Sequence, residues 1–218
     1  MTVIPAVNAA SFAEAKAQLE KIAGLFSEPR GRFVHIDITD GKFTLHETWG
    51  TPEDYKELIA SYLKSGMQFE VHLMVQNPEL VLNSWLAIGI QRVILHVEAM
   101  SDAEIITDQC RAVSVEAMLS ANLETPIQEL VKHSSEFSAF QILAVAPGKA
   151  GQIFSPEAFQ KISSLRAAVP RATIEVDGGI TREVAAAVKN AGANIVVSAS
   201  YILENKNPSQ AFRELSQI

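Results

Sequence analysis

The sequence predicts an α/β protein of the (β/α)8 TIM-barrel class, and three observations carry this prediction. Short apolar runs alternate with segments of helical periodicity eight times along the chain. The apolar runs are nearly continuous, as expected for parallel strands that are buried on both faces. The length of 218 residues suits eight such units closed into a barrel. We expect one domain over residues 1–218, because no linker, low-complexity stretch or charge run interrupts the pattern.

The expected strands are rich in Val, Ile and Phe, and a polar turn follows each of them. They are Val3–Val7, Phe33–Asp37, Gln68–His72, Arg92–Val97, Val115–Leu119, Phe140–Val145, Thr173–Val176 and Asn194–Val197. The expected helices carry apolar residues at helical spacing. They are Ser11–Phe26, Pro52–Ser65, Pro78–Ile88, Asp102–Ala112, Pro126–Lys132, Pro156–Ala168, Arg182–Ala191 and Pro208–Ser216.

Proline and glycine mark the ends of several expected helices. Five of the helices begin at or near a proline, where the missing N–H costs no hydrogen bond. Gly66, Gly89 and Gly192 follow the second, third and seventh helices, where a glycine can end the helix. An open doubly wound sheet is the structural alternative. It would normally carry a glycine-rich turn after the first strand, and Pro5–Asn8 is not one.

Composition limits the classes of partner and the compartment. The net charge of −7 argues against a nucleic-acid partner, although local N–H groups can still bind an anionic substrate. The single cysteine, Cys110, allows no internal disulfide and is interpreted as a structural residue. No apolar stretch approaches the length of a transmembrane helix, and the N-terminus lacks the basic segment of a signal peptide. We therefore expect a cytoplasmic protein without a membrane partner.

Four polar side chains at strand ends indicate a metal site. His35 and Asp37 end the second strand, His72 ends the third and Asp177 follows the seventh. The carboxyl ends of barrel strands meet at one mouth, where barrel enzymes have their active sites. A single histidine or aspartate at a strand end is more often structural. Four together would each need a partner in an apolar barrel, and one Zn2+, Fe2+ or Mn2+ ion supplies it for all of them.

Other polar residues near the mouth have less specific interpretations. Asp40 lies in a Thr-Asp-Gly turn and is expected to stabilise it. His96 and Glu98 end the fourth strand, where orienting a metal ligand and plain packing are equally acceptable interpretations. Glycine-bearing turns after the sixth and seventh strands and the turn Val197–Ser200 after the eighth indicate a phosphate site.

Five segments make the chain resemble the ribulose-5-phosphate 3-epimerases of the pentose phosphate pathway. The likeness runs from about Ile4 to Leu203, and the order and spacing of the segments match those of the family. The segments are His35–Gly41 (HIDITDG), Val71–Val75 (VHLMV), Leu95–Ala99 (LHVEA), Val145–Gln152 (VAPGKAGQ) and Val176–Ile180 (VDGGI).

The resemblance implies a metal-dependent barrel enzyme that interconverts D-ribulose 5-phosphate and D-xylulose 5-phosphate through a metal-stabilised enediolate. The family's ligands to one divalent ion (Zn, Fe, Mn or Co) map onto His35, Asp37, His72 and Asp177. Its two acid/base aspartates map onto Asp37 and Asp177. The implied substrate and phosphate contacts are Asn8, Met74, Gly148, Gly151, Gln152, Gly178, Gly179, Ala199 and Ser200. The implied partner is a small phosphorylated ketose, and the implied assembly is a homo-oligomer.

Several residues depart from the family pattern around this site. Ala6 stands where the family has a substrate-binding serine. Asn8 is the candidate to replace that serine, although its side chain starts from a different position in the chain. Thr39 and Leu143 stand where the family usually has methionines. Residues 42–50 differ from the usual loop, Lys149-Ala150 replaces Phe-Gly, and Ala199 replaces a glycine. The metal ligands are thus kept while the substrate pocket differs.

These departures leave other functions open. One alternative is a 3-epimerase of another ketose phosphate, such as a hexulose 6-phosphate. A second is a related barrel decarboxylase, which ranks low because Thr39 occupies the lysine position of its Asp-x-Lys-x-x-Asp motif. A third is a non-catalytic phosphosugar-binding barrel. The four retained ligands disfavour it, because a buried charged cluster is costly without a role.

Overall fold

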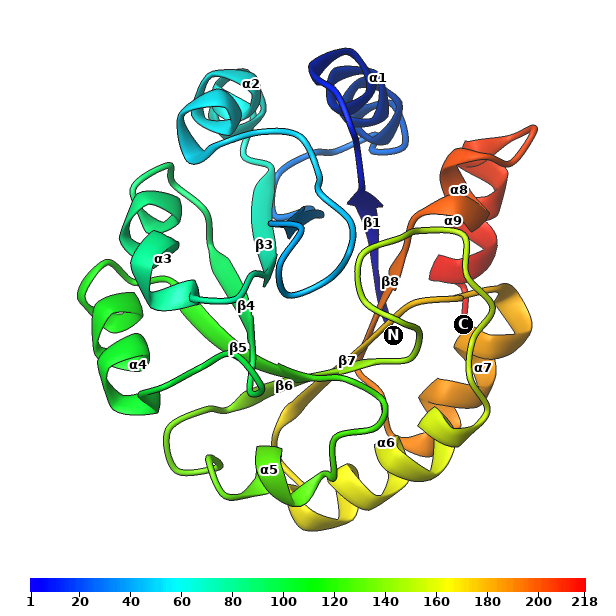
Figure 1. The fold of residues 1–218 in the computed structure, drawn as a ribbon. Coiled ribbons are helices and arrows are strands. Elements are labelled where there is room, and N and C mark those ends of the chain that lie inside the picture. Colours follow the sequence, from blue (N-terminus) through cyan, green and yellow to red (C-terminus); the bar gives the residue numbers. More distant parts are fainter.

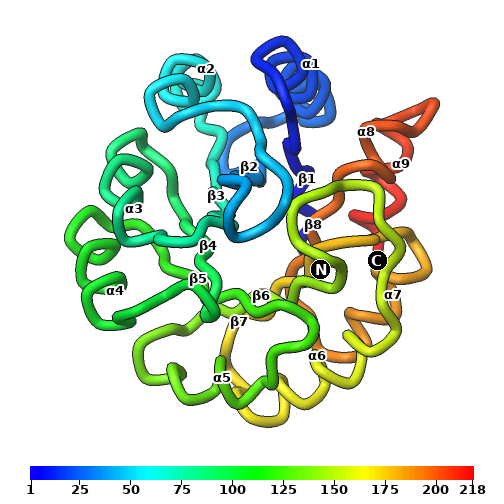
Figure 2. The backbone as a smooth tube through the Cα atoms, in the orientation of Figure 1, coloured from blue at the N-terminus to red at the C-terminus, as the bar shows by residue number.

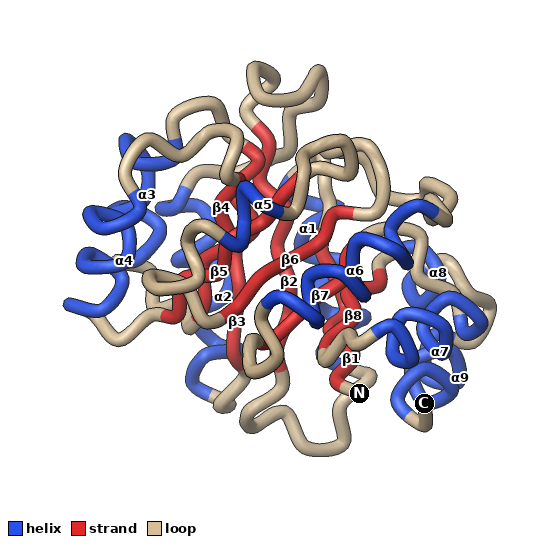
Figure 3. The backbone as a smooth tube through the Cα atoms, turned by 90° about the horizontal axis from the view of Figure 1, so that it is seen from below, coloured by secondary structure: helices blue, strands red, loops and turns tan.

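The computed structural model describes residues 1–218, and its eight strands form a closed parallel barrel in the order β1 to β8. Figure 1 looks along the barrel, with the helices in a ring outside the strands, and Figure 3 shows the strands in red running through the middle of the molecule. The predicted (β/α)8 fold is confirmed. The strands are β1 Thr2–Val7, β2 Phe33–Thr39, β3 Gln68–Met74, β4 Arg92–His96, β5 Glu116–Ala121, β6 Ala139–Leu143, β7 Thr173–Asp177 and β8 Ile195–Ser198.

The helices follow the strands in the expected alternation. None of them is both long and apolar enough to cross a lipid bilayer. They are α1 Phe12–Ala23, α2 Pro52–Lys64, α3 Pro78–Leu86, α4 Ala103–Ala112, α5 Gln128–Val131, α6 Glu157–Ala168, α7 Arg182–Ala191, α8 Ser200–Leu203 and α9 Pro208–Ser216.

Local chemistry explains where the helices begin and end. Ser11, predicted as the first helical residue, is instead the N-cap, and its hydroxyl accepts from the Glu14 N–H. Thr51 and Asp54 form a reciprocal capping box at the start of α2. Gly192 ends α7 with φ of 115°, a conformation that side chains with a Cβ rarely adopt. The predicted fifth helix shrinks to four residues, and the short α8 was not predicted as a helix.

The apolar core lies between the strands and the surrounding helices. One cluster of 47 buried hydrophobic residues fills this layer, with Tyr55, Phe69 and Phe140 among its largest fully buried side chains. The barrel interior is different, because charged and polar side chains occupy its lower layer. Glu70, Gln141 and Glu175 are completely buried there. The barrel therefore needs internal partners for these groups.

Arg92 provides the positive charge for the carboxylates of this interior layer. Its guanidinium lies 2.5 Å from Glu70 Oε2, 2.6 Å from Glu116 Oε2 and 3.7 Å from Glu175 Oε2. Gln141 donates to Glu175 Oε1 at 3.0 Å and accepts from the Ser120 hydroxyl at 2.6 Å. Burial and the neighbouring Glu70 charge raise the pKa of Glu175 to about 8. Arg92 thus compensates charge that water cannot reach.

Replacing this guanidinium tests its importance for folding. Arg92→Met keeps an unbranched apolar side chain but leaves Glu70 without its buried cation. We expect the free energy of unfolding to fall by about 3–5 kcal/mol in urea titrations. Arg111→Met is the control, because Arg111 pairs with Asp108 on the surface, where the two side chains are 71% and 60% exposed. It should change stability by less than about 0.5 kcal/mol. Equal effects of the two substitutions would contradict the role of Arg92.

Candidate functional site

The structure brings together the two histidines and two aspartates that the sequence singled out. His35 and Asp37 are two positions apart in β2, so their side chains share the inner face of the barrel. The strand register pairs Asp37 with His72 of β3. Asp177 is the last residue of β7 and reaches the same point from across the barrel.

The ligand atoms of these four residues all lie within 4.8 Å of one another. His35 Nε2 is 3.1 Å from Asp37 Oδ1 and 3.9 Å from Asp177 Oδ2. His72 Nδ1 is 3.4 Å and 3.5 Å from the same two oxygens. The histidine side chains are fully buried, while those of Asp37 and Asp177 are 11% and 14% exposed. Two nitrogens and two carboxylate oxygens therefore face a common centre.

This centre fits a divalent metal ion. His72 Nδ1 is buried and has no hydrogen-bond partner, although two carboxylates lie near it. A buried nitrogen without a partner is costly, and a cation at the centre would supply one. Two imidazoles with two carboxylates form a donor set that suits transition metals. The cluster could thus bind a metal.

The other nitrogen of each histidine is already engaged. His35 Nδ1 lies 2.7 Å from Glu70 Oε1. His72 Nε2 lies 2.9 Å from His96 Nε2, and His96 Nδ1 lies 3.1 Å from Glu98 Oε2. Glu98 in turn accepts from the Asn122 N–H at 2.8 Å and from the Thr125 hydroxyl. Such partners hold metal-binding imidazoles in place. Of the two interpretations of His96 and Glu98, orienting a metal ligand therefore fits better than plain packing.

With a cation at the common centre, these contacts imply one set of neutral tautomers. Glu70 is an acceptor, so His35 donates from Nδ1 and keeps a lone pair on Nε2 for the centre. Glu98 is also an acceptor, so His96 donates from Nδ1 and accepts at Nε2 from His72. His72 then keeps its lone pair on Nδ1, the atom that faces the carboxylates. Burial lowers the pKa of His96 to about 4, which keeps this imidazole neutral.

Without a cation at the centre, the charges of the cluster stabilise one another. Burial would lower the pKa of His35, but hydrogen bonds to Asp37 and Glu70 outweigh burial and raise it well above its usual value. Burial would raise the pKa of Asp37, but the nearby imidazoles of His35 and His72 hold it far below its usual range. Asp37 is therefore a carboxylate in the folded protein.

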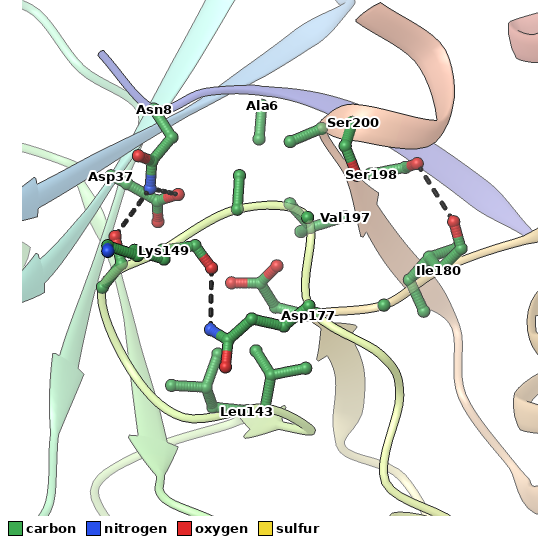
Figure 4. A pocket seen from close by; sticks show the side chains of 18 of the residues that line it. Ala6, Asn8, Asp37, Leu143, Lys149, Asp177, Ile180, Val197, Ser198 and Ser200 are labelled. Atoms are coloured by element: carbon green, nitrogen blue, oxygen red, sulfur yellow. Dashed lines mark hydrogen bonds between the residues drawn. The ribbon is translucent and has the colours of Figure 1, made fainter. Parts of the chain in front are cut away.

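A cavity opens beside the cluster, and Figure 4 shows Asp37 and Asp177 among the side chains that line it. Asp37 and Asp177 line it, whereas His35 and His72 lie beneath it. Ala6 and Leu143 are on its wall, but Thr39 is not: its buried hydroxyl has no partner. All nine residues expected to contact substrate or phosphate line this cavity: Asn8, Met74, Gly148, Gly151, Gln152, Gly178, Gly179, Ala199 and Ser200.

One side of the cavity presents free backbone donors. The N–H groups of Gly178, Gly179, Ala199 and Ser200 donate to no acceptor within the protein. Gly179 has φ of 67°, and a Cβ there would lie 2.2 Å from the Phe154 backbone nitrogen. Only glycine permits this close approach of two chain segments. Four unpaired donors beside a cavity are suited to hold an anion.

The sequence analysis missed two charged residues of the barrel interior, while its interpretations of Asp40 and Cys110 agree with the structure. Glu70 and Arg92 were not singled out, although a charged residue inside an apolar strand is itself a signal. Asp40 caps its turn as expected, because Oδ1 accepts from the Lys42 and Phe43 N–H groups at 2.9 Å each. Cys110 is buried, in agreement with a structural role.

The chain resembles known proteins over nearly its whole length. Residues 2–203 match the model of the "Ribulose-phosphate 3 epimerase family". The chain is 28% identical over 213 residues to the ribulose-phosphate 3-epimerase of Schizosaccharomyces pombe, covering 98% of this chain and 91% of that protein. It is 35% identical over 179 residues to the ribulose-phosphate 3-epimerase of Chlamydia pneumoniae, covering 79% and 76%.

Solved structures show the same fold at much lower identity. The 3-hexulose-6-phosphate synthase of Salmonella typhimurium superposes with a TM-score of 0.73 at 14% identity, covering 100% of this chain and 97% of that one. At this identity the likeness supports the barrel fold alone. The match to the family model spans most of the chain and includes all four clustered side chains. The chain therefore belongs to the ribulose-phosphate 3-epimerase family and is an epimerase.

Proposed function

We propose that the protein is a metal-dependent 3-epimerase that interconverts D-ribulose 5-phosphate and D-xylulose 5-phosphate. The observation that carries the proposal is the convergence of Asp37 and Asp177, from β2 and β7, beside two buried imidazoles at the floor of the cavity. His35, Asp37, His72 and Asp177 would hold one Zn, Fe, Mn or Co ion. Family membership supports the reaction class, and the cavity residues support the choice of a phosphorylated ketose.

The reaction requires proton transfer on both faces of one carbon. The hydrogen on C3 is acidified by the neighbouring C2 carbonyl, so its removal gives an enediolate. A bound divalent ion would act as a Lewis acid and stabilise the negative charge that develops on the substrate oxygens. Asp37 and Asp177 come from opposite sides of the barrel, so one can accept the C3 proton while the other returns a proton to the opposite face.

The other cavity residues would place the substrate for this transfer. The free N–H groups of Gly178, Gly179, Ala199 and Ser200 would bind the phosphate, which fixes one end of the sugar. Met74 and Leu143 line the cavity as apolar wall near the aspartates. Ala6 leaves more room than a serine would, which is why a hexulose 6-phosphate is the second substrate to test.

Substitution of the two aspartates tests the reaction. The purified protein, with its metal content measured, is incubated with D-ribulose 5-phosphate while D-xylulose 5-phosphate is followed. Asp37→Asn and Asp177→Asn should each lower kcat by about 10²- to 10⁴-fold, because each removes one proton carrier. Asp108→Asn, an exposed carboxylate on α4, is the matched control and should retain activity. A wild-type protein that turns over neither ketose phosphate, even when Zn2+, Fe2+, Mn2+ or Co2+ is supplied, would contradict the proposal.

The phosphate contact is tested at one glycine that lines the cavity and one that does not. Gly179→Ala brings a Cβ within 2.6 Å of the Phe154 Cα, so the backbone must shift and the donors with it. We expect KM to rise about tenfold or more, equivalent to about 1.4 kcal/mol of lost binding. Gly31→Ala is the control, since its φ is also positive at 72°, nothing lies within 4 Å of the added Cβ, and Gly31 does not line the cavity. Equal KM values for the two variants would contradict phosphate binding here.

A further inference from the structure

We infer that Asn8 is a positioning residue that links the carboxylate of Asp37 to the loop after β6, so that this loop and the proton carrier are held by one amide group. The inference rests on the proposed function of Asp37. It differs from the substrate contact expected for Asn8, because the amide N–H groups of this side chain are already engaged within the protein.

The Asn8 amide nitrogen donates two hydrogen bonds to two different segments of the chain. Nδ2 donates to Asp37 Oδ2 at 2.9 Å and to the Gly148 carbonyl at 3.1 Å, as Figure 4 shows. Both partners are acceptors, so the orientation of the amide is determined and its nitrogen must face them. Asp37 Oδ1 faces the two histidines, and Oδ2 is the oxygen that Asn8 holds. The torsion of the carboxylate is thus set from both sides.

The backbone of Asn8 is itself held firmly. Val7, the last residue of β1, pairs with Ile36 in the barrel register, so the residues that follow them, Asn8 and Asp37, lie side by side. The side-chain amide of Gln18 from α1 accepts from the Asn8 N–H at 2.9 Å and donates to the Asn8 carbonyl at 3.0 Å. Asn8 therefore projects its amide from a fixed point.

The loop, residues 145–154, has few ties of its own. None of its backbone N–H groups donates to a protein acceptor. Gln152 bonds two carbonyls within the loop. From outside the loop come two bonds only: Thr44 Oγ1 donates to the Pro147 carbonyl at 2.9 Å, and Asn8 donates to the Gly148 carbonyl. In Figure 2 this yellow-green loop and the light-blue loop that carries Thr44 lie beside each other over the barrel.

The loop in this position leaves little space for a substrate. The cavity beneath it has a volume of about 40 Å³, enough for a few water molecules. Entry of a sugar phosphate would then require the loop to move away, which would separate the Gly148 carbonyl from Asn8. When the loop returns, Asn8 again bridges it to Asp37. The coupling would hold the proton carrier and the closed loop together while the substrate reacts.

Removing the amide tests this coupling. Asn8→Leu has nearly the same size but no donor, and Asn8→Ala gives a second test in case leucine does not fit. With saturating metal, both should lower kcat about 10- to 100-fold, the usual effect of losing a hydrogen bond to a metal-binding carboxylate. Thr44→Val is the matched control, because it removes the other outside bond to the loop without touching Asp37.

Hydrogen exchange in D2O separates positioning from a general defect. Each epimer is incubated separately, and deuterium at C3 is measured against epimerisation. An Asn8 variant should slow removal of the C3 proton of the one epimer that Asp37 deprotonates, the same epimer that Asp37→Asn affects. The other epimer should exchange through Asp177 without epimerising. Thr44→Val should raise KM but keep the two exchange rates in the wild-type ratio.

The outcomes distinguish the two proposals. An active wild-type enzyme with an Asn8→Leu variant of unchanged kcat would overturn the positioning role alone. So would variants that slow the exchange of both epimers equally, because a merely structural role predicts that result. A wild-type protein without exchange or turnover would overturn the proposed function and the role of Asn8 with it.

Discussion

The mutual repulsion of two carboxylates at the floor of a nearly closed cavity is the constraint on which the rest of the structure depends. Asp37 and Asp177 approach within 4.8 Å of each other, where little water reaches them. Like charges at that separation in a medium of low dielectric constant are strongly unfavourable. The two imidazoles beneath them offset part of the repulsion, and a divalent cation at the common centre would offset the remainder.

The barrel interior extends this compensation away from the mouth. Glu70 holds His35, and Arg92 holds Glu70, so a chain of charge-assisted hydrogen bonds runs from the cluster toward the amino ends of the strands. On the other side, His96 and Glu98 hold His72. Each chain fixes the orientation of one imidazole, so that one ring nitrogen of each histidine faces the centre. The site is therefore organised before any ligand arrives, which reduces the cost of binding.

Much of the fold and part of the site could be predicted because they follow local patterns. The continuous apolar strands and the proline and glycine boundaries are periodic signals, and the strand ends brought His35 and Asp177 to one mouth. Glu70 was missed although it shares the inner face of β3 with His72, two positions away. Period-two spacing from a proposed ligand is the signal that could have found it. The four-residue α8 is too short to show periodicity.

The function of Asn8 could not be predicted in the same way. Its position at the end of the first strand indicated a residue at the mouth and led to the expectation of a substrate contact. Its actual partners, Asp37 and Gly148, are 29 and 140 residues away in sequence. Which of several nearby acceptors an amide chooses depends on strand register and loop position together. Neither of these is encoded in a local pattern.

Anomalous diffraction from crystals of the purified protein, collected on both sides of the absorption edge of its measured metal, tests the central claim most directly. We predict one anomalous peak at bonding distance, about 2.0–2.3 Å, from His35 Nε2, His72 Nδ1 and an oxygen of each aspartate. An active crystal form without a peak at this centre, or with the metal bound by other residues, would contradict the account.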